Sequence, residues 1–198
     1  VRSLVLALGM RGLADVRPLP PEFAFAPYLA HQLAVAGAAR GLARATAVMD
    51  SDDAFTAGLL HDLGKLLTAL YRPEDWQAQA ALAAAEGLPW HEAEERHWGL
   101  DHGLIGGMVL RSWNLPESLT EPVNWHHAPL AAPGRPLPCA LTSLADALAR
   151  EATDTPQPGI APDPALAARL GLSLDAARQC VKAALAERDT AALAAALA

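Results

Sequence analysis

Apolar side chains recur every three or four residues along most of the chain, which is the spacing of one face of an α-helix. The segment AFTAGLLHDLGKLL shows the pattern most clearly, because its large apolar side chains fall within a sector roughly 120° wide. His61, Asp62 and Lys65 fall together in a second sector. The pattern predicts a helix with this polar sector and with a buried face formed by Phe55, Leu59, Leu63, Leu66, Leu67 and Leu70.

Proline and glycine interrupt the pattern and divide the chain into predicted helices. Ser51 precedes two aspartates and is predicted to cap a helix, and Pro116 suits the first position of a later one. Residues 128–138 and 153–164 are predicted loops. The predicted helices, with bounds good to about two to four residues, cover residues 2–13, 27–48, 52–71, 73–86, 89–98, 101–113, 116–127, 137–150, 163–170 and 174–187.

The composition favours an all-α fold. Alanine (45) and leucine (33), the strongest helix formers, far outnumber the 18 Ile, Val and Thr residues that strands would need, so a sandwich, a barrel or a doubly wound sheet is excluded. The length of 198 residues suits one domain with a helical annex. We expect a helical domain over residues 1–152 and a C-terminal helical appendage over 153–198, whose alanine-rich end, TAALAAALA, forms a weak helix.

Charge and cysteine content indicate which partners and which cellular compartment to expect. The net charge of −7 leaves no basic face for nucleic acid, and no run of eighteen apolar residues could span a membrane. Cys139 and Cys180 do not form a disulfide framework, so we expect a cytoplasmic protein. Because the chain starts with Val1 rather than Met, we expect it to be part of a longer protein.

The histidines are the main candidates for chemistry. His61, Asp62 and Lys65 lie together, and adjacent His and Asp residues can offer one nitrogen and one oxygen ligand to a metal ion. Other histidines and one later aspartate also fall on inward helix faces or at a helix end, where they need polar partners. The candidate metal ligands are His31, His61, Asp62, His102, His126, His127 and Asp146.

Each of these residues also has a simpler interpretation. His31 suits a core histidine bonded to a carbonyl, Asp146 a surface carboxylate, and the paired His126 and His127 a helix C-terminal cap. As a set, however, they favour a shared metal centre. The remaining two histidines, with Glu92, Glu94 and Glu95 near them, are predicted to form a solvated charged face; they are His91 and His97.

The motif GLLHDLGKL resembles the signature of the HD superfamily of metal-dependent phosphohydrolases, whose ligand order the seven candidates follow. More narrowly, AFTAGLLHDLGKL, RHWGLDHGLIGGMVLRSWNLPESL, WHHAP and LADALA resemble the HDOD domain, an HD-related output domain of bacterial signalling proteins. VRSLVLALG at the start is also similar to that family. The resemblance covers about residues 1–150 and implies an HD-type helical bundle.

Two departures from the related families matter. The HDOD family usually has a further N-terminal helical half before the segment that opens this chain. The HD-GYP cyclic-di-GMP phosphodiesterases carry an acidic residue and a Gly-Tyr-Pro loop after the paired histidines, whereas Ala128 and Pro129 stand here, which argues against cyclic-di-GMP. Many HDOD domains have lost ligands of the HD set, but this sequence retains all of them.

The resemblance implies one or two divalent ions, with Fe, Mn, Zn, Ni and Mg not distinguished. Asp62 would bridge, with His31, His61 and Asp146 on one ion and His102, His126 and His127 on the other. Asp62 and Lys65 are the implied catalytic residues of a metal-dependent phosphohydrolase or phosphodiesterase of nucleotide phosphoesters. Lys65 would act as a point charge on a phosphate oxygen or on the metal-bound water.

Two alternatives stay open. In the first, the domain is a non-catalytic output module that binds a signalling partner protein or a small ligand, and the His/Asp cluster is structural or sensory. In the second, weaker one, the same ligands form a diiron site that handles oxygen.

Overall fold

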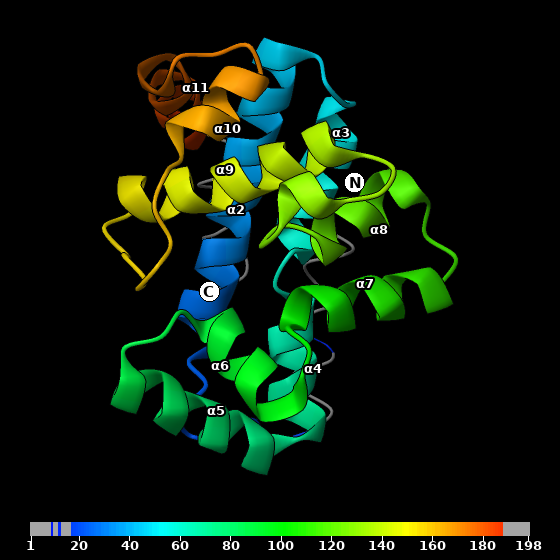
Figure 1. Ribbon diagram of the computed structural model, residues 1–198, viewed down its shortest axis with the longest axis vertical. Coiled ribbons are helices and arrows are strands. Elements are labelled where there is room, and N and C mark those ends of the chain that lie inside the picture. The colour runs from blue at the N-terminus through cyan, green and yellow to red at the C-terminus, as the bar shows by residue number, and fades with distance from the viewer. Residues whose placement is uncertain (1–8, 10–11, 13–16, 188–198) are drawn as a thin grey trace.

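The computed structural model describes residues 9, 12 and 17–187, and the predicted helix over residues 2–13 and the alanine-rich end lie outside this part of the chain, except for residues 9 and 12. Within it the chain is helical, with one isolated bridge between Gln157 and Ile160 as its strand-like pairing, so the all-α prediction is confirmed (Figure 1). The elements are α2 (Phe25–Thr46), α3 (Ser51–Leu60), α4 (Leu63–Tyr71), α5 (Pro73–Glu86), α6 (Trp90–Trp98), α7 (His102–Ser112), α8 (Glu117–Asn124), η1 (Pro129–Ala131), α9 (Pro136–Ala152), α10 (Pro164–Arg169) and α11 (Leu174–Ala186).

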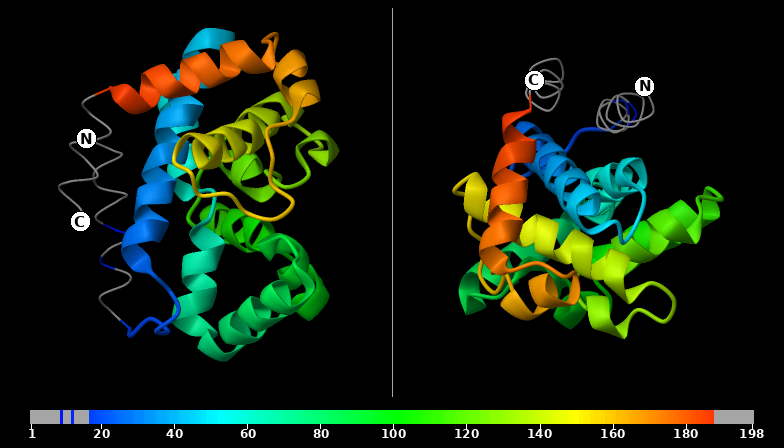
Figure 2. Two further views of the ribbon diagram at one scale, coloured as in Figure 1. Left: turned by 90° about the vertical axis from the view of Figure 1, so that its left-hand side faces the viewer. Right: turned by 90° about the horizontal axis from the view of Figure 1, so that it is seen from above.

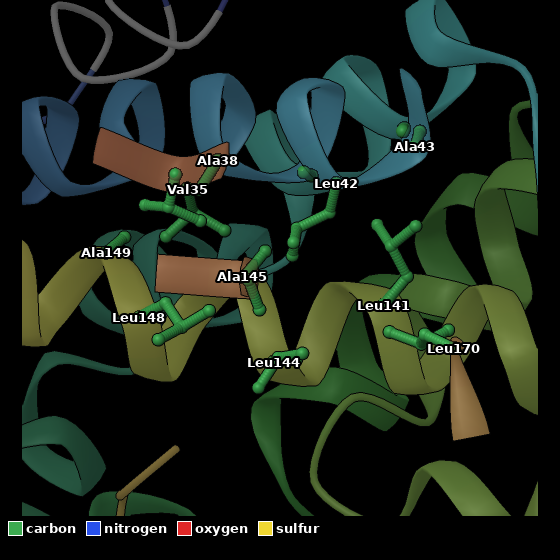
Figure 3. Packing of buried hydrophobic residues seen from close by; sticks show 14 of the residues in the cluster. Val35, Ala38, Leu42, Ala43, Leu141, Leu144, Ala145, Leu148, Ala149 and Leu170 are labelled. Carbon is green, nitrogen blue, oxygen red and sulfur yellow. The ribbon is translucent and has the colours of Figure 1, made fainter. Parts of the chain in front are cut away.

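Helices α2 and α9 form one part of the core. Small residues on α2, such as Ala38, let α9 approach closely, and Val35 and Leu42 pack against Leu144 and Leu148 (Figure 3). The same apolar cluster includes residues of α10 and α11, which pack beside α2 and α9 (Figure 2). The domain boundary at residue 153 stays a prediction.

A second apolar cluster surrounds α4. Its members include Leu29 of α2, Leu110 of α7 and Val123 of α8. The predicted core face is buried at Phe55, Leu59, Leu63, Leu66 and Leu70, and half-buried at Leu67. None of the described helices combines the length and the apolar character needed to cross a membrane.

The single helix predicted over residues 52–71 is wrong. The chain leaves the helical path at Asp62, with φ −98° and ψ 15°, so that α3 ends at Leu60 and α4 begins at Leu63. Close packing of α4 against the start of α7 at Gly64 overrides the local preference for a continuous helix. The break directs both His61 and Asp62 toward the same interior point.

Three predicted helix ends also move. Asp50, not Ser51, caps α3, because its carboxylate accepts hydrogen bonds from the amides of Asp52 and Asp53. Pro116 is the N-cap residue of α8 rather than its first residue. Helix α8 stops at Asn124, short of the predicted residue 127, and the Val123 carbonyl accepts a hydrogen bond from the His126 ring instead.

Candidate metal centre

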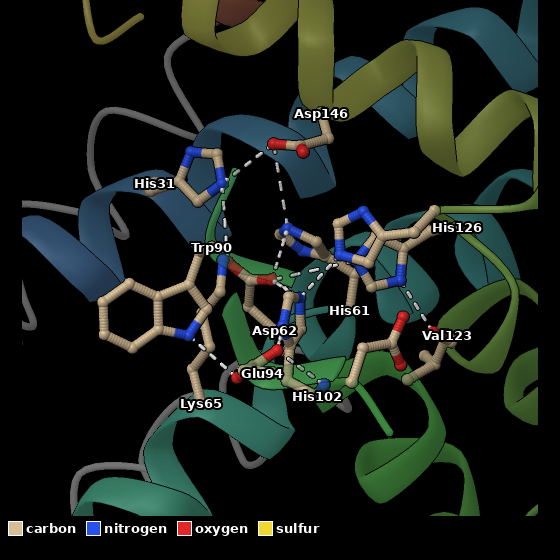
Figure 4. A network of polar contacts seen from close by, with 12 residues as sticks. His31, His61, Asp62, Lys65, Trp90, Glu94, His102, Val123, His126 and Asp146 are labelled. Atoms are coloured by element: carbon tan, nitrogen blue, oxygen red, sulfur yellow. Dashed lines mark hydrogen bonds and ion pairs between the residues drawn. The ribbon is translucent and has the colours of Figure 1, made fainter. Parts of the chain in front are cut away.

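The seven candidate ligands come from five parts of the fold and meet in its interior (Figure 4). One lies in the middle of α2, two at the junction of α3 and α4, one at the first residue of α7, two in the turn after α8 and one on α9. They are His31, His61, Asp62, His102, His126, His127 and Asp146, and all are buried except His31 and His127, which are half-buried.

Asp62 lies at the middle of the cluster. Its Oδ1 is 2.8 Å from His102 Nε2, 3.5 Å from His61 Nε2 and 3.9 Å from His126 Nε2. Its Oδ2 faces the other way and accepts a hydrogen bond from the Lys65 ammonium at 2.8 Å. The two oxygens of one carboxylate therefore face different chemistry, imidazoles on one side and a primary ammonium on the other.

Asp146 and His31 close the cluster on the side of α2 and α9. Asp146 Oδ1 lies 3.0 Å from His31 Nε2 and 3.9 Å from His61 Nε2. The Asp146 side chain is only 4% exposed, so α9 presents it to the interior rather than to solvent. The surface-carboxylate interpretation of Asp146 is therefore excluded by the geometry.

Backbone carbonyls orient two of the histidines. The His61 ring contacts the Gly58 carbonyl through Nδ1 at 2.8 Å, and the His126 ring contacts the Val123 carbonyl through Nδ1 at 2.7 Å. Because a carbonyl can only accept, Nδ1 carries the proton in both rings, and each Nε2 is left with a lone pair directed at the cluster.

A buried carboxylate, that of Glu94, orients the ring of a third histidine, His102. Glu94 is 0% exposed, and its Oε2 accepts from both the backbone amide of His102, at 2.8 Å, and His102 Nδ1, at 2.5 Å. Its other oxygen accepts from the Trp90 indole at 2.8 Å. The prediction that Glu94 belongs to a solvated charged face is therefore wrong. Carboxylates in this position fix the ring orientation of metal-ligating histidines and raise their basicity.

His91 was also expected on that solvated face, and this is wrong as well. Its ring stacks on His127, with centroids 4.0 Å apart and planes 12° apart. His127 in turn lies 2.8 Å, Nε2 to Nε2, from His102. His97 does lie on the surface, where it pairs with Asp75 at 2.8 Å.

The centre fits a metal ion because two buried imidazole nitrogens, His61 Nε2 and His126 Nε2, have no hydrogen-bond partner among the described residues. They lie 3.5 Å and 3.9 Å from Asp62 Oδ1. Unpaired polar atoms inside a protein cost free energy, and one nitrogen- and oxygen-binding cation can satisfy several of them together. The ligand atoms of His61, Asp62 and His126 all lie within 4.8 Å of one another.

The histidines that carry unpaired nitrogens are held neutral. Burial lowers the pKa of His61 to about 3, although the Asp62 and Asp146 carboxylates act in the opposite direction. Burial and the positive charge of His102 lower the pKa of His126 to about 4. Since a metal binds the neutral imidazole, both rings are in the protonation state that ligation needs at neutral pH.

His102 and the carboxylates are held charged while no ion is bound, so an ion that takes His102 Nε2 as a ligand displaces its proton. Burial lowers the pKa of His102, but Glu94 and Asp62 outweigh it and raise the pKa to about 9. Burial raises the pKa of Asp146, yet its contacts with His31 and Arg150 hold that pKa well below the usual range. Neighbouring imidazoles and the Lys65 ammonium do the same for the pKa of Asp62.

Sequence patterns missed three residues that contact the centre. Arg150 lies one helical turn after Asp146, and its Nε is 2.8 Å from Asp146 Oδ1. The Tyr28 hydroxyl donates to the Asp62 carbonyl at 3.3 Å, and Glu94 orients His102 as described. The i, i+4 spacing of Asp146 and Arg150 was the one signal in the sequence that could have pointed to an ion pair.

Two openings lead to the centre. A cavity of about 360 Å³ is lined on its inner side by His31, Asp62, Lys65 and Arg150. A second cavity of about 170 Å³ reaches His126, His127 and Asp146 from the other side. Residues of the loop between α9 and α10 line both cavities. Thr153, Thr155 and Gln157 line the first, and Gly159, Ile160 and Ala161 line the second.

Comparison with known proteins adds a family assignment. A sequence profile of the HDOD domain matches residues 1–129. An uncharacterized protein of Treponema pallidum is 31% identical over 90 residues, which are 45% of this chain and only 18% of that protein. This chain therefore spans less than a fifth of the length of that relative.

Solved structures share the fold. A candidate phosphohydrolase from Shewanella amazonensis matches all of this chain and 72% of its own, with a TM-score of 0.76 at 21% identity. An HDOD domain protein of unknown function from Geobacter sulfurreducens matches 99% of this chain and 69% of its own, with a TM-score of 0.72 at 22% sequence identity. A candidate signal transduction protein from Marinobacter aquaeolei matches 98% of this chain and 44% of its own, with a TM-score of 0.80 at 20% sequence identity.

Proposed function

Since the chain belongs to the HDOD domain family, we propose that it is a signal-transduction domain that retains an HD-type metal centre and hydrolyses phosphoesters of nucleotides. Two buried imidazole nitrogens without a partner, His61 Nε2 and His126 Nε2, which face the Asp62 carboxylate, carry the proposal. A polar network without an ion would give these nitrogens protein donors. The similarity in fold to a candidate phosphohydrolase supports the choice of reaction.

The proposed ligands come from the seven residues of the cluster, with Asp62 as the central carboxylate. A divalent ion bound there supplies Lewis-acid activation of water and of a phosphoryl oxygen. Glu94 holds His102 with its Nε2 toward Asp62, and the Gly58 and Val123 carbonyls do the same for His61 and His126. These partners fix the ligand geometry before an ion arrives, which favours binding.

The larger cavity is the proposed substrate site. Lys65 and Arg150 both line it, and both carry positive charge for phosphate oxygens. Its volume of about 360 Å³ stands near the lower end of the roughly 300–1,000 Å³ of small-molecule sites, so it suits one nucleotide or a smaller phosphoester. Tyr28 and Pro27 offer apolar surface at the outer wall, and Thr153, Thr155 and Gln157 offer hydrogen-bonding groups.

The charge balance explains why an ion would help an anionic substrate to bind. Asp62 and Asp146 are matched by Lys65 and Arg150, and Glu94 faces His102. A divalent ion that displaces the His102 proton adds one net positive charge to this balanced group. A bound ion would therefore strengthen the attraction of the site for a phosphate.

Metal content and hydrolysis test the proposal together. We expect the purified protein, equilibrated with Mn²⁺ or Fe²⁺, to retain metal and to hydrolyse an aryl phosphodiester or a member of a nucleotide panel. The Asp62→Ala variant should lose both, with its helix content checked by circular dichroism. His97→Ala is the matched control, because His97 lies on the surface and pairs with Asp75.

A second candidate function is a non-catalytic output module. The same charge balance favours it, since Lys65 and Arg150 already pair with the two carboxylates of the cluster. In this case the centre holds a structural or sensory ion, and the domain acts by binding a partner protein or a small ligand. Metal retained without hydrolysis of any compound in the panel would support this candidate over the first.

A further inference from the structure

Arg150 places a guanidinium on one half of the metal centre. Its side chain is 11% exposed, and its Nη2 lies 2.8 Å from His31 Nε2 and 3.8 Å from Asp62 Oδ2. Its Nε lies 2.8 Å from Asp146 Oδ1. One cation thus contacts three of the proposed ligand residues at the atoms that would face an ion.

A guanidinium and a metal ion compete for such atoms. Arginine carries five N–H donors, has no acceptor, and stays protonated in proteins. The nitrogen His31 Nε2 has one lone pair, so it cannot accept a hydrogen bond from Arg150 and coordinate an ion at once. Carboxylate oxygen Asp146 Oδ1 is the second atom that both cations would use.

The two oxygens of Asp62 divide the centre in the same way. Oδ2 faces two cations, the Lys65 ammonium at 2.8 Å and the Arg150 guanidinium at 3.8 Å. Oδ1 faces the imidazoles of His61, His102 and His126, and two of these rings, His61 and His126, have an unpaired Nε2. Lysine and arginine neutralise one side of this carboxylate, while an ion can join the imidazoles on the other.

The ligand groups that the structure forms leave room for few combinations. His61 and His126 each offer only Nε2, because their Nδ1 atoms contact carbonyls. Groups that share either residue therefore cannot be filled at the same time. The one pair of groups without a shared residue is His31, His61 and Asp146 with His102, His126 and His127. The first of these two groups is the one that Arg150 contacts.

We propose that the centre binds a single ion, on the imidazole side of Asp62, and that Arg150 takes the place of a second ion beside His31 and Asp146. This inference rests on the proposed function and specifies its ion stoichiometry. Asp62 Oδ1, His61, His102 and His126 hold the ion, with His127 beside them. Arg150 and Lys65 face the larger cavity from the opposite side and supply positive charge to a phosphate there.

Metal stoichiometry tests the inference without relying on activity. After equilibration with Mn²⁺ and removal of free ions, we expect about one Mn²⁺ per chain in the native protein and about two in Arg150→Gln. Arg178→Gln is the matched control, since Arg178 forms an exposed ion pair with Glu151, and it should stay at about one. Thermal melting confirms that each variant is folded.

Electron paramagnetic resonance of the native protein gives a second measurement that needs no variant. A Mn²⁺ titration should show isolated-ion spectra up to saturation, without the exchange-coupled signal of two adjacent ions. Two ions in the native protein, or one ion in a folded Arg150→Gln, would overturn the inference while leaving the proposed function intact. Absence of bound metal in every protein would overturn both.

Discussion

The carbonyl group of His102 lies directly against the α-carbon of Gly64, so that even a methyl group at residue 64 would overlap it. Gly64 stands in the first turn of α4, two residues after Asp62, and His102 is the first residue of α7. This contact brings the His102 ring to within 2.8 Å of the Asp62 carboxylate. A glycine is thus required for the geometry of the centre, not for a turn.

We expect Gly64→Ala to destabilise the protein and to reduce its metal content. The added carbon forces α4 and α7 apart, and overpacking of this kind costs about 1–3 kcal/mol. Urea unfolding and metal analysis would measure the two effects. Gly106→Ala is the comparison, because its new methyl group meets the Val123 side chain at 3.1 Å, which can yield by a few tenths of an ångström. Equal stability of the two variants would contradict the expectation.

Glu94→Gln should weaken metal binding more than folding. A glutamine side chain has one acceptor oxygen where glutamate has two, so it cannot accept hydrogen bonds from the Trp90 indole and from His102 on separate oxygens. The His102 ring therefore loses its carboxylate partner. Loss of such a partner lowers metal affinity by about 10–100-fold in other metal sites. Competition with a chromophoric chelator would measure the affinity. Glu95→Gln is the control, because it alters an exposed neighbour of Glu94 and should leave the metal affinity unchanged.

Lys65→Gln should lower hydrolysis while metal stays bound. Lys65 contacts the Asp62 oxygen that faces away from the imidazoles and lines the larger cavity. Removing a group that stabilises transition-state charge costs about 10²–10³-fold in kcat. Steady-state kinetics with metal analysis would separate the two effects. The chain's other lysine provides the control, since Lys182→Gln changes an exposed side chain. Unchanged kcat in Lys65→Gln would exclude its catalytic role.

The chelator-treated protein should be most stable at about pH 7. His61, with a pKa near 3, and His126, with a pKa near 4, stay neutral in the folded chain, so the unfolded chain binds more protons below pH 6.5. At pH 5 each group lowers the free energy of unfolding by about 2 kcal/mol. His102, with a pKa near 9, has the opposite sign: its contribution is full below about pH 6.5 and is lost as the pH rises from there to about 9.

Melting temperatures between pH 5 and 10 would check this dependence. The expected curve falls on both sides of about pH 7, and more steeply on the acid side, where two histidines act together. A melting temperature that is constant from pH 7 to pH 5 would show that these rings are not held neutral by burial.

Helical periodicity predicted which side chains of the centre face inward, but not the helix break at Asp62 that directs two of them to one point. The inward position of His31 followed from sharing a face with Val35, and the buried face of the segment around His61 followed from its leucines. The break at Asp62 did not follow, because it depends on α7 packing against Gly64, a contact between distant parts of the chain. Tertiary packing of this kind has no local signal.

Charged neighbours hid two residues that contact the centre. Glu94 lies among Glu92, Glu95 and Arg96, a composition typical of an exposed face, yet α6 turns it inward to the Trp90 indole and His102. Arg150 lies near the end of α9 and pairs with His31 of α2 and with Asp62, between α3 and α4, only in the folded chain. A buried charge is identified by its partners, and these partners are far away in sequence.

Diffraction from crystals soaked in Mn²⁺, with data collected to show anomalous scattering, would test the metal centre most directly. We predict a peak about 2.0–2.3 Å from Asp62 Oδ1 and from the Nε2 atoms of His61, His102 and His126. A fully soaked crystal in which this position has no anomalous signal, with Asp62 paired only to Lys65 and His102, would contradict the metal centre.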